Sequence, residues 1–316
     1  MRSGFADLNL PVSADDDVHS VRERLAEANR LGYSSVAATA AVSASTLCLG
    51  EVHTASRLLP AWPMGDAVVC ASTAGAPAAL RLRPLYQLTR LTVVLDEPEQ
   101  LGPGGSKLRS AAALSYDLLA VSPTSDKAFA ATCTSLPVDV ISCDVSRRLP
   151  FRLRPQLVRA ALARGLTFEL CYAPCLRDVA ARRQTFAGAA AVCRAVAAAG
   201  GCHTSLSISS GAARACELRG PADVANLAVT LFGLSKAGAA RNCVSRNANS
   251  IIAHATARRS AVKTCAVGLT SLTGGISSGI ERAEKGWPPQ TTGFPPAAAG
   301  ITARESGVAD SLFLRV

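Results

Sequence analysis

Aromatic side chains are scarce in this chain: phenylalanine, tryptophan and tyrosine together make up 4% of its 316 residues. So few rings leave little material for stacking on nucleic-acid bases. The chain also lacks any charge-free run of roughly 18 apolar residues, so we expect no membrane span. Its first residues contain no apolar signal region, and we do not expect secretion.

Common cofactor and metal motifs are missing as well. No GxGxxG follows the first apolar run, and no GxxxxGK[ST] occurs. The four histidines, His19, His53, His203 and His254, show neither HxH nor HExxH spacing. Eleven cysteines are present without a CxxC pair, which favours buried free thiols over disulfides or a zinc site. The sequence therefore predicts no metal or cofactor bound by the protein itself.

What the chain does have is a strongly uneven charge. The formal net charge is +10. Residues 1–144 contain 11 Lys and Arg against 15 Asp and Glu, whereas residues 145–269 contain 18 against 4. Residues 270–316 contain four of each sign. A basic half of this kind indicates a polyanionic partner, the alternative being a solvated basic surface.

Seven short apolar runs alternate with stretches of helical periodicity. Strands buried on both faces have this composition, and helical spacers suit right-handed crossovers between parallel strands. The number of repeats favours an α/β fold, a slightly irregular TIM-like (β/α) barrel, over an open doubly wound sheet. The expected strands are FADLNL (5–10), SSVAATA (34–40), LTRLTVVL (88–95), DLLAVS (117–122), VDVISCD (138–144), TFELCYA (167–173) and TSLSISS (204–210).

Two segments interrupt this alternation. Residues 41–85 mix Ser, Ala, Pro and Gly, and we expect an elaborated loop there with one short helix. Residues 270–316 are rich in Gly, Pro, Ser and Thr without periodicity, which is typical of a disordered tail. The sequence therefore predicts one barrel domain over residues 1–269, followed by a low-complexity tail over 270–316.

Polar residues fall near the ends of several expected strands, where a barrel would place its chemistry. Glu169 is expected to point into the barrel, where a carboxylate must be paired, and Arg90 is its expected partner. We interpret this pair as structural, with general acid–base chemistry as the alternative. Asp7, Ser209 and Ser210 are also expected at the barrel mouth, and the two serines can either donate to a phosphate or cap the next turn.

The segment ELRGPADVANLAVTLFGLS (217–235) has the features of a helix entrance. Pro221 suits the first helical position, and Asp223 favours the positive end of the helix dipole. Arg219 then lies at the mouth of the helix, a good place to grip a phosphate. One apolar face is expected to follow at helical spacing, consisting of Val224, Leu227, Ala228, Leu231 and Phe232.

Several stretches resemble one known family. They are FADLNLP, LTRLTVVL, RLPFRLRPQLVRAALARGLTFELCYAP, ARRQT, SISSGAARACELRGPADVANLAVTLFGLS and SRNANSIIAHATARR, and they follow one another in order from about Phe5 to Lys263. In this order they resemble the thirty-kilodalton protein subunit of ribonuclease P and ribonuclease MRP. The pairing of SSGA with ELRGPxDVANL is the most specific part of the resemblance.

The resemblance implies a barrel related to the polymerase-and-histidinol-phosphatase phosphoesterases but without their metal-binding histidines. It implies a noncatalytic, RNA-binding subunit of the RNA-based enzyme that removes the 5′ leader from precursor tRNA. The subunit would be shared with the MRP particle, which processes ribosomal RNA precursors. Its implied partners are the ribonuclease P RNA and MRP RNA, a small α/β-sandwich subunit and the other subunits of the particle. Mg²⁺ would be held by the RNA, and the location would be the nucleus and nucleolus.

Arginines at helix entrances and late in the chain are the expected RNA contacts, because phosphate contacts supply affinity and position without reading bases. For each one the alternative is a solvated surface charge. The expected set is Arg177, Arg182, Arg183, Arg219, Arg246, Arg258, Arg259 and Lys263. A metal-dependent phosphoesterase on the same barrel is the alternative function. It is disfavoured because Asp7-Leu8-Asn9 stands where such an enzyme would need HxH, and two oxygen ligands do not replace a histidine cluster.

Overall fold

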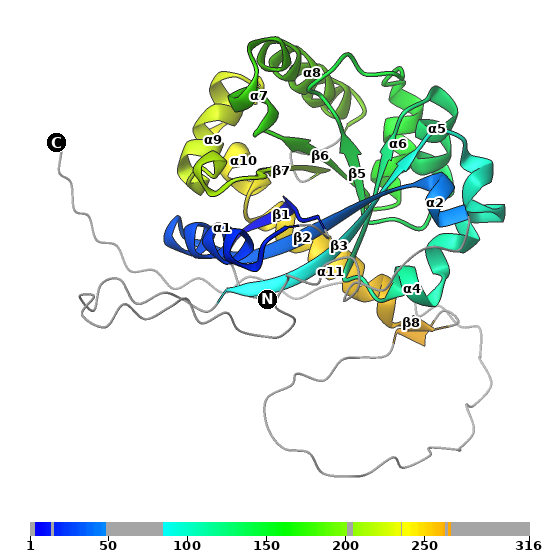
Figure 1. Cartoon of the computed structure of the whole chain (residues 1–316). Coiled ribbons are helices and arrows are strands. Elements are labelled where there is room, and N and C mark those ends of the chain that lie inside the picture. The colour runs from blue at the N-terminus through cyan, green and yellow to red at the C-terminus, as the bar shows by residue number, and fades with distance from the viewer. Residues whose placement is uncertain are drawn as a thin grey trace, which may run out of the picture. The chain divides into compact units, whose positions relative to one another are not determined.

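The computed structural model describes residues 4–13, 16–48, 85–200, 205–234, 236–262 and 265–266. Within them, seven parallel strands pair in chain order to form a nearly closed barrel with helices around it (Figure 1). The strands are β1 (Phe5–Pro11), β2 (Tyr33–Ser43), β3 (Tyr86–Leu95), β4 (Leu118–Pro123), β5 (Val140–Cys143), β6 (Thr167–Cys171) and β7 (Leu206–Ser209). Each overlaps one of the seven expected runs, so the predicted TIM-like barrel is confirmed.

Helical segments connect the strands and follow the last of them. The α-helices are α1 (Val18–Arg30), α2 (Ala44–Cys48), α4 (Ala111–Leu114), α5 (Asp126–Thr134), α6 (Pro155–Ala163), α7 (Pro174–Arg177), α8 (Val179–Ala198), α9 (Pro221–Thr230), α10 (Ala237–Cys243) and α11 (Arg246–Ser260). Short 3-10 segments are η2 (Pro98–Leu101), η3 (Pro103–Arg109) and η5 (Ala215–Glu217), and β8 (Ala261–Val262) pairs antiparallel with β9 (Cys265–Ala266). No described helix is long and apolar enough to cross a membrane.

Two predicted segments fall largely outside the described residues. Of the expected 41–85 loop, the structure describes the end of β2, the short helix α2 and residue 85. The expected tail over 270–316 lies wholly outside, so the predicted domain boundary at 269 stays a prediction.

A register shift in β1 decides which of its side chains face the barrel interior. Ala6 and Leu8 belong to the interior apolar cluster, whereas Leu10 belongs to the outer cluster under the helices. With strict alternation all three would face the same side. The shift between Asp7 and Leu10 in the pairing with β2 switches the faces, as a β-bulge does, and Asn9 reaches the centre of the barrel.

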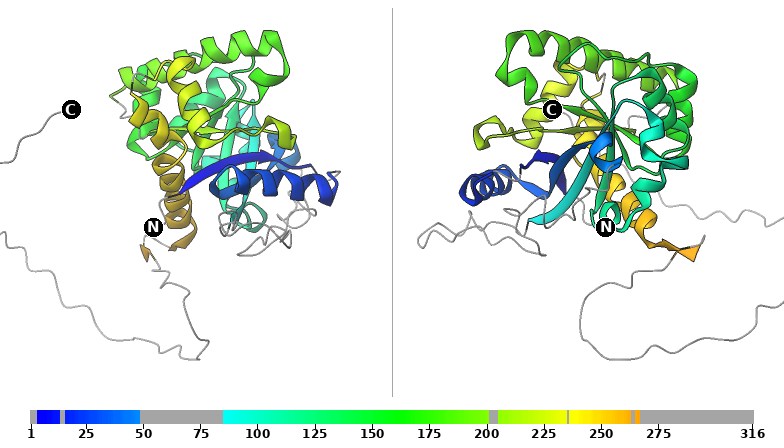
Figure 2. Two further views of the ribbon diagram at one scale, coloured as in Figure 1. Left: turned by 90° about the vertical axis from the view of Figure 1, so that its left-hand side faces the viewer. Right: turned by 45° about the vertical axis from the view of Figure 1, so that its right-hand side comes forward.

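Helix α11 crosses the amino ends of the strands and seals that end of the barrel (Figure 2). Its buried Ala248, Ile251 and Ala255 pack against interior side chains of β1, β2, β4 and β5. The Asn247 amide donates to the carbonyl of Leu206 at 2.7 Å, at the start of β7. With the amino end covered in this way, the loops after the carboxyl ends of the strands are the natural place for a binding surface.

Candidate nucleic-acid interface

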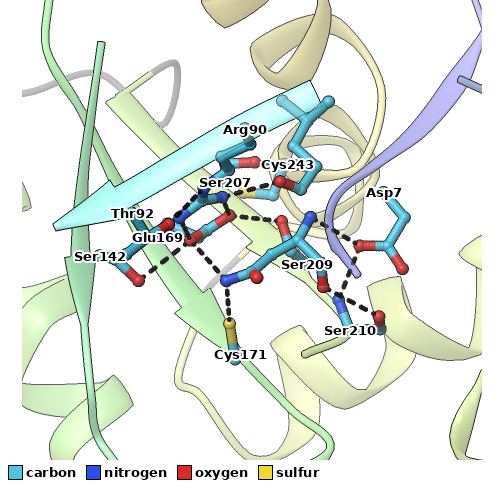
Figure 3. A network of polar contacts seen from close by, with 12 residues as sticks. Asp7, Arg90, Thr92, Ser142, Glu169, Cys171, Ser207, Ser209, Ser210 and Cys243 are labelled. Atoms are coloured by element: carbon cyan, nitrogen blue, oxygen red, sulfur yellow. Dashed lines mark hydrogen bonds and ion pairs between the residues drawn. The ribbon is translucent and has the colours of Figure 1, made fainter. Parts of the chain in front are cut away.

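A fully buried ion pair, in which neither side chain is exposed to solvent, lies at the centre of the barrel (Figure 3). The Arg90 guanidinium donates to both carboxylate oxygens of Glu169, at 2.5 and 2.6 Å. The same carboxylate accepts from Ser142 Oγ at 3.1 Å, Ser209 Oγ at 2.7 Å and Asn9 Nδ2 at 3.1 Å. The predicted pairing of Arg90 with Glu169 is therefore confirmed.

This network keeps the Glu169 carboxylate ionised and fully hydrogen-bonded. Burial alone would raise the pKa of Glu169, but Arg90 and the two serine hydroxyls lower it below its usual range. Five donated hydrogen bonds saturate its two oxygens. Glu169 is thus placed to hold β3, β5, β6 and β7 together rather than to accept a proton from a substrate.

Asp7 lies at the seam between β1 and β7. Its Oδ1 accepts from the backbone N–H groups of Ser210 at 2.9 Å and Asn9 at 3.3 Å. Its buried Oδ2 has no hydrogen-bond partner among the described residues. Burial raises the pKa of Asp7 to about 6, so this carboxyl group titrates closer to neutrality than an exposed aspartate. The neighbouring bond from Gly211 N–H to the Asn9 carbonyl, 2.9 Å long, also bridges the seam.

The barrel-mouth serines act as structural groups. Ser209 donates to Glu169, and Ser210 Oγ accepts from the backbone N–H of Ala212 at 3.1 Å. Ser210 Oγ therefore caps the turn after β7, and donation to a phosphate stays a prediction. In the described part of the chain, no three His, Cys, Asp or Glu side chains are grouped so that they could hold a metal ion.

The loop after β7 is organised around Glu217, whose side chain is 5% exposed. Its carboxylate takes two hydrogen bonds from Arg177, at 2.9 and 2.7 Å, and one from Arg214 at 3.2 Å. It also accepts from the Ala213 N–H at 2.9 Å. The hydrogen bonds from Arg177 lower the pKa of Glu217 to about 2. The buried Glu217 carboxylate thus fixes the loop after β7 and joins it to α7 through the guanidinium of Arg177.

Two buried tyrosines hold the backbone of Arg219 in front of α9. The Arg219 N–H donates to Tyr172 Oη at 2.9 Å, and Tyr33 Oη donates to the Arg219 carbonyl at 3.0 Å. The exposed guanidinium folds back onto the carbonyls of Cys216 and Leu218, both at 2.8 Å. Arg219 therefore lies at the entrance of α9, as predicted, with part of its donor capacity used on its own loop.

Helix α9 begins as the sequence predicts, with Pro221 in the first helical position and Asp223 exposed in the first turn. The predicted apolar face is wrong at Leu231, which is 41% exposed. The helix ends at Thr230, so the helical spacing that would have turned Leu231 inward no longer applies.

The predicted RNA contacts separate into two groups at opposite ends of the barrel. Arg177 on α7, Arg182 and Arg183 in the first turns of α8, and Arg219 follow the carboxyl ends of β6 and β7. Arg182 Nε donates to the Cys175 carbonyl at 2.8 Å, and Arg183 is exposed without a hydrogen bond or ion pair to a described residue.

The second group lies on α11 at the amino end. Arg258 donates through two guanidinium nitrogens to the buried Asp139, with the shortest distance at 2.8 Å, and His254 Nδ1 lies 2.8 Å from the same carboxylate. Arg259 pairs with Asp117, immediately before β4. Arg246 is exposed in the first turn of α11, and Lys263 lies outside the described residues.

Sequence reasoning missed Arg147, Arg148 and Arg152 in the loop between β5 and α6, all three exposed. They are part of the excess of basic residues after residue 144, which was the available signal. It also missed Arg214 and the tyrosines that hold Arg219. Hydrogen bonds between residues so distant in the chain, such as Tyr33 with Arg219, leave no local pattern.

The fold and the surface define an α/β barrel protein whose polar centre is filled by its own ion pair. One group of its arginines lies in loops and helix starts at the carboxyl end of the barrel, and a second group lies on α11 at the amino end. The comparison with known families is specific. The family described as RNase P subunit p30 matches residues 4–260, and the chain belongs to this family.

Individual relatives agree with this assignment. Ribonuclease P protein subunit p30 of Mus musculus is 33% identical over 267 residues, covering 82% of this chain and 88% of the mouse protein. Ribonuclease P/MRP protein subunit RPP1 of Saccharomyces cerevisiae is 32% identical over 106 residues, 34% of each chain. A chain in the cryo-EM structure of archaeal Ribonuclease P with mature tRNA superposes with a TM-score of 0.56 at 14% identity, covering 85% of this chain and 99% of that one. At that identity, the structural likeness supports the fold.

Proposed function

We propose that the chain is a protein subunit of ribonuclease P and takes part in removing the 5′ leader from precursor tRNA. The observation that carries the proposal is family membership over residues 4–260. The yeast relative bears the names of both ribonuclease P and MRP, so the proposal includes a place in the MRP particle and in the processing of ribosomal RNA precursors. The location that goes with these particles is the nucleus, including the nucleolus.

In this proposal the protein contributes no active site. The carboxylate at the barrel centre is saturated by Arg90, Asn9 and two serines. Mg²⁺ for the cleavage step would be held by the partner RNA. The role of the protein is to bind and position that RNA through arginines, and to contact a small α/β-sandwich subunit and the other proteins of the particle.

The proposal is tested on tagged protein purified gently from its own cells and assayed on precursor tRNA before and after micrococcal nuclease. In the control sample, the same nuclease is first inactivated by chelation of its calcium. The nuclease is removed from both samples before the assay. We expect co-purifying cleavage activity that nuclease abolishes and the inactivated nuclease preserves. Activity that survives digestion of the RNA would contradict a noncatalytic role and would favour the metal-dependent phosphoesterase. Absence of any ribonuclease P RNA in the purified material would contradict the subunit role itself.

A further inference from the structure

A groove of about 690 Å³ lies between the β5–α6 loop and helix α8. It is distinct from the loop that carries Arg219, because its two walls come from the segments after β5 and β6 rather than from the segment after β7. The charged residues that line it are Arg147, Arg148, Arg152 and Asp126.

The loop wall of the groove is anchored rather than loose. Phe151, 6% exposed, stacks on Phe129 with ring centroids 4.4 Å apart and an angle of 10° between the planes. Asp126 accepts from the backbone N–H of Arg152 at 2.9 Å, and Asp144 accepts from that of Ser146 at 3.0 Å. The arginines of this loop therefore project from a backbone that is held before any ligand arrives.

The helix wall is made of small and neutral residues. Gln184, Ala187, Gly188 and Ala191 recur at helical spacing along one face of α8. A Cβ added at Gly188 would come within 3.0 Å of the Val145 Cβ, so the glycine permits α8 to approach the loop closely. Small side chains leave space along the helix, and no carboxylate from α8 lines the groove.

The three arginines of the groove are exposed and differ from the paired arginines elsewhere in the described chain. Their side chains make no hydrogen bond or ion pair with a described residue, unlike those of Arg177, Arg258 and Arg259. Asp126 is the one carboxylate in the lining, and one of its oxygens is engaged by the backbone. Exposed guanidinium groups without internal partners have their donors available for phosphate oxygens.

We propose that this groove binds the sugar–phosphate backbone of the RNA that resides in the particle, an inference that rests on the proposed function. Three arginines against one aspartate in the lining favour an anionic occupant. Its single aromatic ring, Phe151, is buried against Phe129, so the groove has no surface for stacking on bases and grips the backbone instead. Several guanidinium groups on an anchored loop suit a resident RNA better than a substrate, which must be released in every cycle. Arg183 directly precedes Gln184 of the groove wall, so α8 connects this surface with the arginines already described.

The test compares two triple variants of the full chain, R147A/R148A/R152A in the groove and R109A/R159A/K236A as a charge-matched control outside it. Binding of each to ribonuclease P RNA is measured as a function of salt, with precursor tRNA in a separate arm. We expect the groove variant to bind the particle RNA about 30- to 100-fold more weakly near 150 mM salt. The slope of log K against log salt should fall by about 2 to 3, as the loss of three phosphate contacts requires. The control and the R147K/R148K/R152K variant should stay within about threefold of wild type.

A second variant, Ala187→Glu, places a carboxylate on the exposed helix wall and should weaken RNA binding without removing an arginine. Two results would overturn the groove as an RNA-binding site and leave the proposed function intact. One is an equal loss of RNA affinity in the groove and control triple variants, and the other is a groove variant that binds RNA as well as a binding-competent wild type does. A loss of binding confined to precursor tRNA would overturn the chosen occupant. If the wild-type chain bound no ribonuclease P RNA either alone or in the assembled particle, the proposed function itself would fail.

Discussion

Two adjacent arginine pairs lie at opposite ends of the barrel and differ in their surroundings. Arg182 and Arg183 open α8 at the carboxyl end, and their side chains make a single hydrogen bond with the described residues, from Arg182 to the Cys175 carbonyl. Arg258 and Arg259 close α11 at the amino end, and each pairs with an aspartate just before a strand. The same dipeptide therefore stands in two different settings: carboxylates engage Arg258 and Arg259, whereas no carboxylate of the described residues pairs with Arg182 or Arg183. We infer that the first pair holds the fold and that the second is available to RNA.

We expect the largest effect at Arg90, whose side chain is fully buried at the centre of the barrel. Glu169→Gln leaves the Arg90 guanidinium buried without a counter-charge, and we expect the free energy of unfolding to fall by about 3–5 kcal/mol. Ser142→Ala is the control, because it removes one neutral donor to the same carboxylate and should cost about 1 kcal/mol. Urea denaturation followed by circular dichroism measures both. If the two variants cost the same, Arg90 and Glu169 do not hold the barrel centre.

At the amino end, Asp139→Asn should cost about 2–4 kcal/mol of unfolding free energy. The substitution removes the buried charge that pairs with Arg258 while keeping an acceptor for the Leu119 N–H. Asp117→Asn is the matched control, because its pair with Arg259 is partly exposed, unlike the buried Asp139, and should contribute only about 0–1 kcal/mol. If Asp117→Asn lowered the free energy of unfolding as much as Asp139→Asn, burial would not determine how much these ion pairs contribute to stability.

Arg177 lies at the carboxyl end of the barrel and is nevertheless paired with a carboxylate, that of Glu217. The folded pKa of Glu217, about 2, is below the ordinary value of 4.5, so its contribution to stability is present above pH 4.5 and is lost as the pH falls towards 2. Glu217→Gln should lower the free energy of unfolding by about 1–2 kcal/mol at pH 7, a modest amount because Arg177 is partly exposed. The difference from wild type should narrow as the pH is lowered from 4.5 towards 2. A difference that is constant with pH would rule out the ion pair as its source.

The strands were predictable because those buried on both faces have continuous apolar composition, and all seven expected runs became strands. The pairing of Arg90 with Glu169 was predictable because a charge inside a barrel needs a partner. The ion pairs of Arg258 and Arg259 were not predictable, because their aspartates lie 119 and 142 residues away in the chain, and the RNA contacts expected of these two arginines stay a prediction. The groove was missed for a similar reason: Gly188 of α8 approaches Val145 of the β5–α6 loop, and Phe151 stacks on Phe129 of α5, only in the folded chain.

The most direct test measures two quantities on the same samples of two double variants, R182A/R183A and R258A/R259A. Each loses two positive charges from one adjacent pair. We expect R182A/R183A to bind ribonuclease P RNA about tenfold more weakly near 150 mM salt, with its free energy of unfolding within about 0.5 kcal/mol of wild type. We expect folded R258A/R259A to bind the RNA as wild type does, with its free energy of unfolding lower by at least about 2 kcal/mol. Equal effects on RNA affinity, or unchanged stability in R258A/R259A, would contradict the division between arginines that hold the fold and arginines that bind RNA.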